Sequence, residues 1–108
     1  MTGSAGVPLG PIHHVGYAVA DLDAALEQLQ RTFATTVTHR EVMTEQGVEA
    51  LMCEGSGGAI ELITPLDPEG AIARFMAKRG EGFHHVAVAV TDVEAALAAL
   101  EAAGAELI

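Results

Sequence analysis

The chain has 108 residues and a formal net charge of −10, with a sequence pI near 4.6. Its length suits one small domain, and half of its residues are hydrophobic, which is enough to build a core. The charge excludes a nucleic-acid-binding protein, because phosphate contacts need clustered Lys and Arg. The sequence also contains no run of about 18 consecutive apolar residues, the length that a membrane span needs. We therefore expect neither nucleic acid nor a membrane as a partner.

The first eleven residues are mainly Gly, Ser, Ala and Pro and have no basic start. This composition predicts a disordered leader over residues 1–11 and argues against a signal peptide. The single cysteine, Cys53, has no partner for an internal disulfide and lies in an apolar run. A small buried cysteine in a reducing compartment fits this context. We therefore expect a cytoplasmic protein whose single folded domain spans residues 12–108.

An internal repeat organises the domain. Residues 12–26 read IHHVGYAVADLDAAL, and residues 83–97, which lie 71 positions later, read FHHVAVAVTDVEAAL. Each copy predicts a strand followed by an Asp and a helix, because the apolar residues after Asp21 and Asp92 recur with helical spacing. An Asp at this place is a favourable helix N-cap. The chain is therefore a tandem duplication of one supersecondary unit.

Between the copies, apolar stretches separated by Gly-containing turns predict strands at 37–43, 48–53 and 59–64. Two prolines then end the sheet, and the spacing of Ile72, Phe75 and Met76 predicts a short amphipathic connector helix. We therefore predict an α+β fold, in which tandem β-α-β-β-β units form a curved, partly open mixed sheet with a truncated second unit. Its parts are a first unit (12–66), a connector helix (67–81) and an incomplete second unit (82–108) in which residues 105–108 begin a strand.

Both repeated strands start with a pair of histidines. Side chains alternate between the two faces of a strand, so His14 and His85 share their faces with Gly and Ala, whereas His13 and His84 share theirs with Val. We interpret the Val-rich faces as packing surfaces for the helices that follow. The small residues leave open volume in front of His14 and His85. A lone His is more often a core residue bonded to a backbone carbonyl, but the duplication favours a shared metal site.

A carboxylate completes a candidate ligand set. Glu61 lies in the otherwise apolar strand AIELI, where an ionised carboxylate is costly to bury unless it is paired or bound to a cation. The alternative is an edge-strand charge that faces water. Together with His14 and His85, Glu61 forms a two-histidine, one-carboxylate set. Such a set suits Zn²⁺ or Co²⁺ as a Lewis acid, or Fe²⁺ in oxygen chemistry.

These features resemble the vicinal oxygen chelate superfamily, which includes glyoxalases, bleomycin resistance proteins and dioxygenases. Within it, the chain resembles the methylmalonyl-CoA epimerases. Four segments carry the narrower resemblance: IHHVGYAV at 12–19, EQGV at 45–48, ELITPL at 61–66, and the connector with IARF at 72–75 and KRGEGFHH at 78–85.

The resemblance implies that His14, Glu61 and His85 bind one divalent metal, with Co²⁺ and Zn²⁺ as the first candidates. It implies an acyl-CoA substrate and epimerisation of methylmalonyl-CoA between 2R and 2S by 1,1-proton transfer through a metal-stabilised enolate. It also implies a catalytic role for Glu49 and substrate binding by Gln46 and Arg79. In the epimerases a further Glu, both ligand and proton-transfer group, comes from the last strand of the second unit, which this sequence does not contain.

Other functions stay open from the residues alone. A glyoxalase-type isomerase or an Fe²⁺ dioxygenase would use the same ligand set, and a metal-free binding module would use the fold only to enclose a small molecule. The incomplete second unit would leave an open sheet edge, which invites pairing. We therefore expect that the chain either continues beyond Ile108 in the intact protein or forms a homodimer that covers this edge.

Overall fold

A computed structural model describes residues 6–108. Up to residue 102 the elements follow the predicted order, and the predicted strand ends agree to within two residues. They are β1 (Ile12–Ala18), α1 (Leu22–Thr32), β2 (Thr36–Met43), β3 (Val48–Gly55), β4 (Gly58–Pro65), α2 (Ala71–Arg79), β5 (Gly82–Val88) and α3 (Val93–Ala102).

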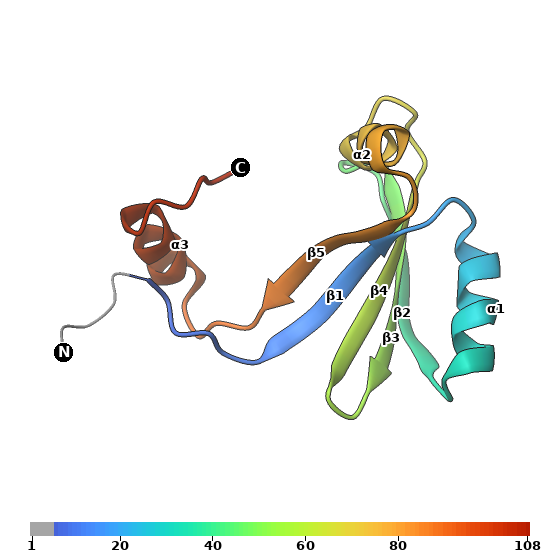
Figure 1. Cartoon of the computed structure of the whole chain (residues 1–108), viewed down its shortest axis with the longest axis horizontal. Helices are drawn as coiled ribbons and strands as arrows, with labels where there is room; N and C mark the ends of the chain where they lie inside the picture. The colour runs from blue at the N-terminus through green and yellow to red at the C-terminus, as the bar shows by residue number, and fades with distance from the viewer. Residues whose placement is uncertain (1–5) are drawn as a thin grey trace.

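The strands form one mixed sheet in the order β2-β3-β4-β1-β5 (Figure 1). Strands β2, β3 and β4 are antiparallel neighbours, while β1 runs parallel to β4 and antiparallel to β5. The two repeated strands, β1 and β5, are therefore adjacent. This topology confirms the predicted α+β fold and brings two histidine pairs from distant parts of the sequence onto neighbouring strands.

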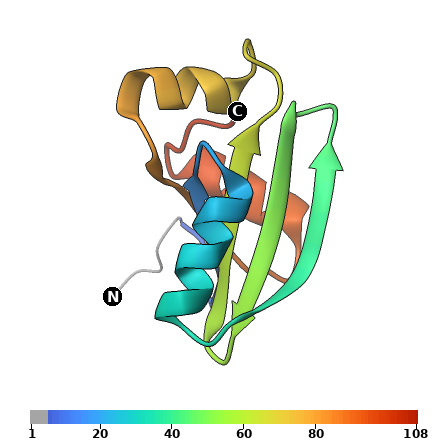
Figure 2. The ribbon, with the colours of Figure 1, turned by 90° about the vertical axis from the view of Figure 1, so that its right-hand side faces the viewer.

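The two faces of the sheet carry different helices and different apolar clusters. Figure 2 shows α1 lying across one face, where it contributes to a buried cluster of Leu22, Leu51, Cys53 and Leu62. On the opposite face α2 contributes to a second cluster, formed by Ala18, Val48, Ala50, Ile63 and Ile72. Neighbours along β3 and β4 alternate between the two clusters, as the pleat of a strand requires.

Both repeated helices begin at the predicted caps. The Asp21 carboxylate accepts a hydrogen bond from the Ala24 backbone N–H at 3.0 Å, and the Asp92 carboxylate accepts one from the Ala95 N–H at 3.0 Å. Each bond satisfies an amide that the first turn of a helix leaves unpaired. The local signals of the repeat are therefore confirmed in both units.

The packing of the second repeated helix differs from the prediction. None of the residues of α3 is buried, and Val86 on β5 is 48% exposed. Figure 1 shows α3 beyond the ends of β1 and β5, apart from the rest of the sheet. The expectation that a Val-rich face packs against the next helix holds for Val19 and α1 and is wrong for α3. In the first unit β3 and β4 widen the apolar surface under the helix, and the described residues of the second unit supply no such strands.

Two terminal predictions have different outcomes. Residues 105–108 do not form the predicted strand. They pair with none of the described strands, so they have no ladder hydrogen bonds. Of the predicted leader, residues 1–5 lie outside the described residues, and residues 6–11 form neither helix nor strand. Among the described helices none combines the length and the apolar character needed to cross a bilayer.

Candidate metal centre

The register of the sheet brings the three predicted ligand residues together. Gly16 on β1 lies opposite Glu61 of β4 in the parallel pairing and opposite His85 of β5 in the antiparallel pairing. Glu61 and His85 therefore flank the same residue from its two sides. His14 lies two positions before Gly16 and so shares its face of β1.

Gly16 leaves the space that the His85 ring occupies. A Cβ atom added at Gly16 would lie 2.2 Å from His85 Cε1 and 2.6 Å from His85 Nδ1. The imidazole of His85 therefore lies directly over the backbone of β1 and reaches His14 across it. The space that the sequence predicts beside the small residues of β1 is therefore filled here by the His85 ring itself.

The potential ligand atoms form a compact triangle. His14 Nε2 lies 3.2 Å from His85 Nε2, and Glu61 Oε1 lies 3.3 Å from His85 Nε2 and 3.6 Å from His14 Nε2. Two ligand atoms at ordinary Zn²⁺ distances in a tetrahedral arrangement are about 3.3 Å apart. The triangle therefore fits three corners of one coordination sphere. These three residues form a group that could hold a metal ion.

Glu61 is not an edge charge facing water. Its strand, β4, lies between β3 and β1, and its side chain is only 14% exposed. The side chains of His14 and His85 are 15% and 33% exposed. A carboxylate so enclosed is costly unless it is paired or bound to a cation, and a cation shared with the two imidazoles would meet that need.

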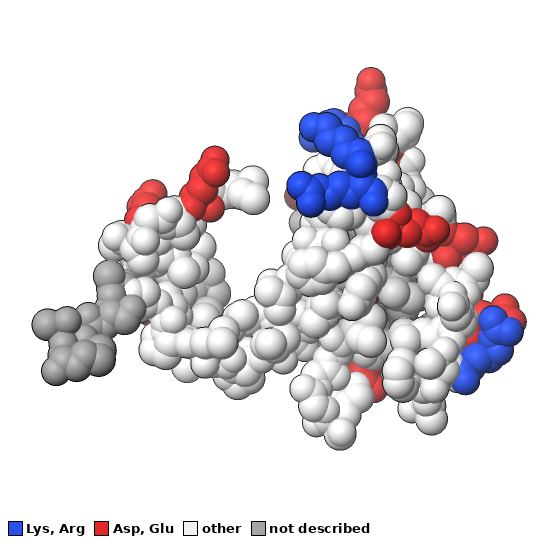
Figure 3. All heavy atoms as spheres, viewed as in Figure 1, with Lys and Arg blue, Asp and Glu red and all other residues white. Residues whose placement is uncertain are grey.

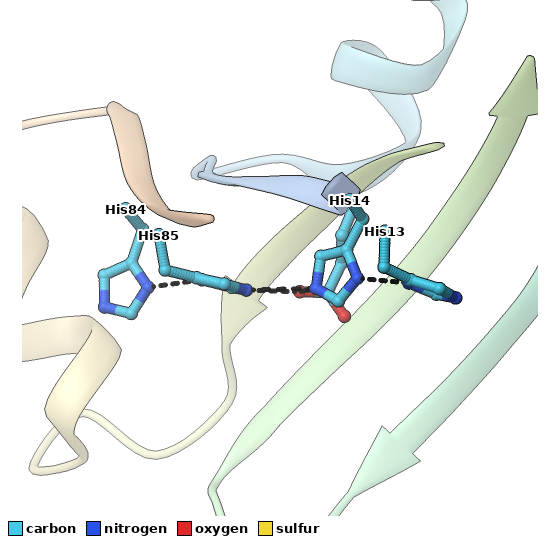
Figure 4. Close-up of polar contacts among 5 residues, drawn as sticks. His13, His14, His84 and His85 are labelled. Carbon is cyan, nitrogen blue, oxygen red and sulfur yellow. Dashed lines mark hydrogen bonds and ion pairs between the residues drawn. The ribbon is translucent and has the colours of Figure 1, made fainter. Parts of the chain in front are cut away.

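The other member of each histidine pair contacts its neighbour. His13 Nδ1 lies 2.8 Å from His14 Nδ1, and His84 Nδ1 lies 2.9 Å from His85 Nδ1. Figure 4 shows the four imidazoles in one row. The sequence alone does not indicate these contacts, because strict alternation assigns His13 and His84 to the opposite face.

His84 is also held by the connector helix. Its ring packs edge-on against the ring of Phe75 in α2, with a centroid distance of 4.8 Å. Burial lowers the pKa of His84, the neighbouring His85 lowers it further, and Glu61 acts in the opposite direction. The environment thus favours the neutral form of this imidazole.

A cavity of about 590 Å³ opens beside the triangle. The three candidate ligand residues line it, together with Gln46 and Arg74. Gln46, one of the two residues expected to bind substrate, thus lines the cavity. Arg79, the other predicted one, ends α2 and is not among the residues that line the cavity.

The basic residues of α2 gather at one end of the molecule. Figure 3 shows these Lys and Arg side chains over α2, and they are Arg74, Lys78 and Arg79. The sequence identifies this cluster but does not indicate that Arg74 is the member that faces the cavity. That choice depends on the angle at which α2 crosses the sheet.

The structure does not bring Glu49 to the candidate ligands. Glu49 lies between Val48 and Ala50 on β3, and both of these pack on the α2 face, so Glu49 points to the α1 face. Its carboxylate accepts a hydrogen bond from Arg40 Nε at 2.9 Å, and Arg40 also donates to Asp23 of α1 at 2.7 Å. The position of Glu49 therefore supports an ion pair between elements and does not support the predicted catalytic role.

Comparison with known proteins places this geometry in a family. A model of the glyoxalase/bleomycin resistance protein/dioxygenase superfamily matches residues 13–108. The chain belongs to this superfamily.

Within the superfamily the chain is similar to epimerases of acyl-CoA substrates. It is 34% identical over 101 residues to the ethylmalonyl-CoA/methylmalonyl-CoA epimerase of Cereibacter sphaeroides, a match that covers 93% of this chain and 75% of the relative. The crystal structure of methylmalonyl-CoA epimerase from Mycobacterium tuberculosis superposes with a TM-score of 0.85 at 34% identity, covering 100% of this chain and 71% of that one.

A second solved structure is similar to the chain and contains a ligand. It is a variant of the Streptomyces coelicolor methylmalonyl-CoA epimerase in complex with 2-nitronate-propionyl-CoA, with a TM-score of 0.82 at 38% identity over 91% of this chain and 74% of that one. Against the human mitochondrial methylmalonyl-CoA epimerase, the match covers 51% of the relative's length.

Proposed function

We propose that the protein is a metal-dependent isomerase that interconverts the 2R and 2S forms of methylmalonyl-CoA by 1,1-proton transfer. The main support is the convergence of three candidate ligands beside a cavity. His14, Glu61 and His85 converge beside a cavity of about 590 Å³ in a chain that is 34–38% identical to methylmalonyl-CoA epimerases.

The donor set determines what the site offers a substrate. His14 and His85 present Nε2 to the same point, and Glu61 adds one carboxylate oxygen. A Co²⁺ or Zn²⁺ ion held by this set would act as a Lewis acid on the thioester and carboxylate oxygens and favour loss of the α-proton. Two neutral imidazoles and one carboxylate leave a divalent site with net positive charge. Such a site suits an anionic acyl group in a protein of net charge −10.

Other residues around the cavity suit an acyl-CoA. Gln46 offers an amide at the turn between β2 and β3, and the Arg74 guanidinium lies on α2. We assign Gln46 and the basic residues of α2, Arg79 among them, to the polar and anionic parts of the substrate. The apolar side chains of Ile63 and Ile72, which line the same cavity, exclude water from the carbon that loses its proton.

Proton exchange tests the function directly. The chain is incubated with Co²⁺ or Zn²⁺ and methylmalonyl-CoA in deuterated water, and mass spectrometry follows deuterium at the α-carbon. We expect metal-dependent exchange that a chelator stops and that His85→Ala abolishes. Isomerisation of a glutathione hemithioacetal without exchange in methylmalonyl-CoA would instead support a glyoxalase. Oxygen uptake with Fe²⁺ would support a dioxygenase, and substrate binding without any metal would support a binding module.

The proposal also includes a cytoplasmic location and a homodimer. The free, buried Cys53 suits a reducing compartment. The apolar side chains exposed on α3, Val93, Leu97 and Leu100, suit an interface with a second copy of the chain.

A further inference from the structure

Each candidate ligand histidine is preceded in the chain by a histidine that interrupts the pairing of β1 with β5. Ile12 pairs with Val88 and His14 with Ala87, so His13 is an extra residue in β1. Gly16 pairs with His85 and Tyr17 with Phe83, so His84 is an extra residue in β5. These are β-bulges, which re-aim a side chain relative to strict alternation. The duplicated strands thus carry the same irregularity at the residue before the ligand.

The bulges turn each extra imidazole toward its neighbour. The Nδ1 atoms of His13 and His14 lie 2.8 Å apart, and those of His84 and His85 lie 2.9 Å apart. The ring planes are nearly perpendicular within each pair, at 79° and 87°. The Nε2 atoms of His14 and His85 remain directed to one another and to Glu61.

The chemistry of the imidazole assigns a direction to both hydrogen bonds. A neutral imidazole carries a proton on one nitrogen and a lone pair on the other. A histidine that ligates a metal through Nε2 must carry its proton on Nδ1, and the partner of that N–H fixes the tautomer and the ring orientation. With a metal bound to Nε2, His14 and His85 would donate through Nδ1, and His13 and His84 would accept through Nδ1. In many metal sites a carboxylate or a carbonyl accepts this bond, whereas here the Nδ1 atom of a second imidazole lies at that place.

We propose that His13 and His84 are positioning residues that hold His14 and His85 in the tautomer and orientation needed to bind the divalent metal. This inference rests on the metal site of the proposed function. The two positions are not equivalent. His84 is half-buried and packs against Phe75, whereas His13 is exposed, so water can replace His13 as an acceptor more easily than it can replace His84. His84 therefore has the larger effect.

Metal affinity of the full chain tests the proposal without any substrate. Titration calorimetry with Zn²⁺ at fixed pH compares the wild type with His84→Ala, His13→Ala and a control, His39→Ala. His39 is an exposed histidine that pairs with Glu41. We expect His84→Ala to weaken Zn²⁺ binding about 10–100-fold, the usual effect of removing such a partner. His13→Ala should have a smaller effect, and His39→Ala should have none.

A rescue variant separates an acceptor from a merely space-filling ring. In His84→Asn the amide oxygen can take the place of the accepting Nδ1, whereas in His84→Leu an apolar side chain takes it. We expect Asn to restore most of the Zn²⁺ affinity and Leu to restore none of it. Equal affinities for Asn and Leu would overturn the proposal.

The tautomers give a second readout. Nitrogen NMR of the Zn²⁺-loaded chain should show Nδ1–H at His14 and His85, and Nε2–H with an accepting Nδ1 at His13 and His84. The opposite tautomers at His84 and His85 would overturn the inference.

The results that would overturn this inference differ from those that would overturn the proposed function. A wild type that does not bind Zn²⁺ would overturn both. Binding that survives His84→Ala would overturn only this inference, and binding without epimerisation would overturn only the function.

Discussion

At the scale of single residues, the geometry of the candidate metal centre depends on the absence of a side chain at Gly16. Gly16 has no side chain, and the His85 ring occupies the place where a Cβ would be. We predict that Gly16→Ala weakens Zn²⁺ binding at least about tenfold, because the added methyl displaces a ligand whose orientation sets metal affinity. The melting temperature should change little, because the displaced imidazole is the end of a flexible side chain.

The matched control is Gly57→Ala. Gly57 lies in the turn between β3 and β4, and a Cβ added there would have no atom within 4 Å. Calorimetry measures the Zn²⁺ affinity of both variants, and thermal melting measures their stability. Wild-type affinity in Gly16→Ala would show that His85 does not bind the metal in the orientation described here.

Cys53 offers a second prediction at this scale. Burial raises the pKa of its thiol, while a hydrogen bond with Thr35 acts in the opposite direction. The thiolate is the reactive form, so we expect iodoacetamide to alkylate the folded chain slowly at pH 8 and the urea-unfolded chain rapidly. Mass spectrometry of timed samples measures both rates. Similar rates would mean that the α1 face of the sheet opens readily.

Some of the residues at the candidate site could be predicted from the sequence and others could not, for a physical reason. His14 and His85 could be singled out as candidates from alternation along two duplicated strands, and Glu61 as a charge in an apolar strand, because these patterns can be read from the sequence of each segment. Glu49 could not be assigned, because a shift of one residue after the turn moves a side chain to the other face. Alternation predicts the wrong face for His13 and His84, because a bulge depends on the partner strand, which a single segment does not reveal.

At the scale of elements, Glu49 joins strands to a helix. Its ion pair with Arg40 links β3 to β2, and Arg40 continues to Asp23 in α1. The Arg40 guanidinium holds the pKa of the Asp23 carboxyl below its ordinary value. We predict that Glu49→Gln leaves Zn²⁺ affinity unchanged and the urea midpoint of unfolding nearly so, because ion pairs between accessible side chains contribute little.

The contrasting variant is Glu61→Gln. It removes the charge from the candidate ligand itself and should weaken Zn²⁺ binding clearly. If Glu49→Gln reduced the affinity as much as Glu61→Gln does, the assignment of Glu49 to the α1 face would be wrong.

At the scale of the whole molecule, the repeat determines the elements but not the way in which the second unit packs. Asp21 and Asp92 cap their helices alike, because capping needs only the first turn. Packing needs a wide apolar surface, and α1 finds one on β3 and β4, whereas α3 finds none among the described strands. The fold of the first unit is therefore predictable from sequence, and the position of α3 depends on surfaces outside its own unit.

The exposed face of α3 leads to the last prediction. Leu97 and Leu100 are 43% and 37% exposed, and Val93 is 62% exposed. Such a group of apolar side chains on a short helix is costly in water and typical of an interface. We predict that the chain sediments as a dimer at micromolar concentration and that Leu97→Glu shifts it to a monomer. The control variant Ala98→Glu adds the same charge at the next residue and should shift the chain to a monomer to a smaller extent. All three ligand residues lie on β1, β4 and β5 of one chain, so Leu97→Glu should still bind Zn²⁺. A wild type that remains monomeric at every concentration would contradict the interface, and loss of Zn²⁺ binding in the monomeric variant would show that the second copy completes the site.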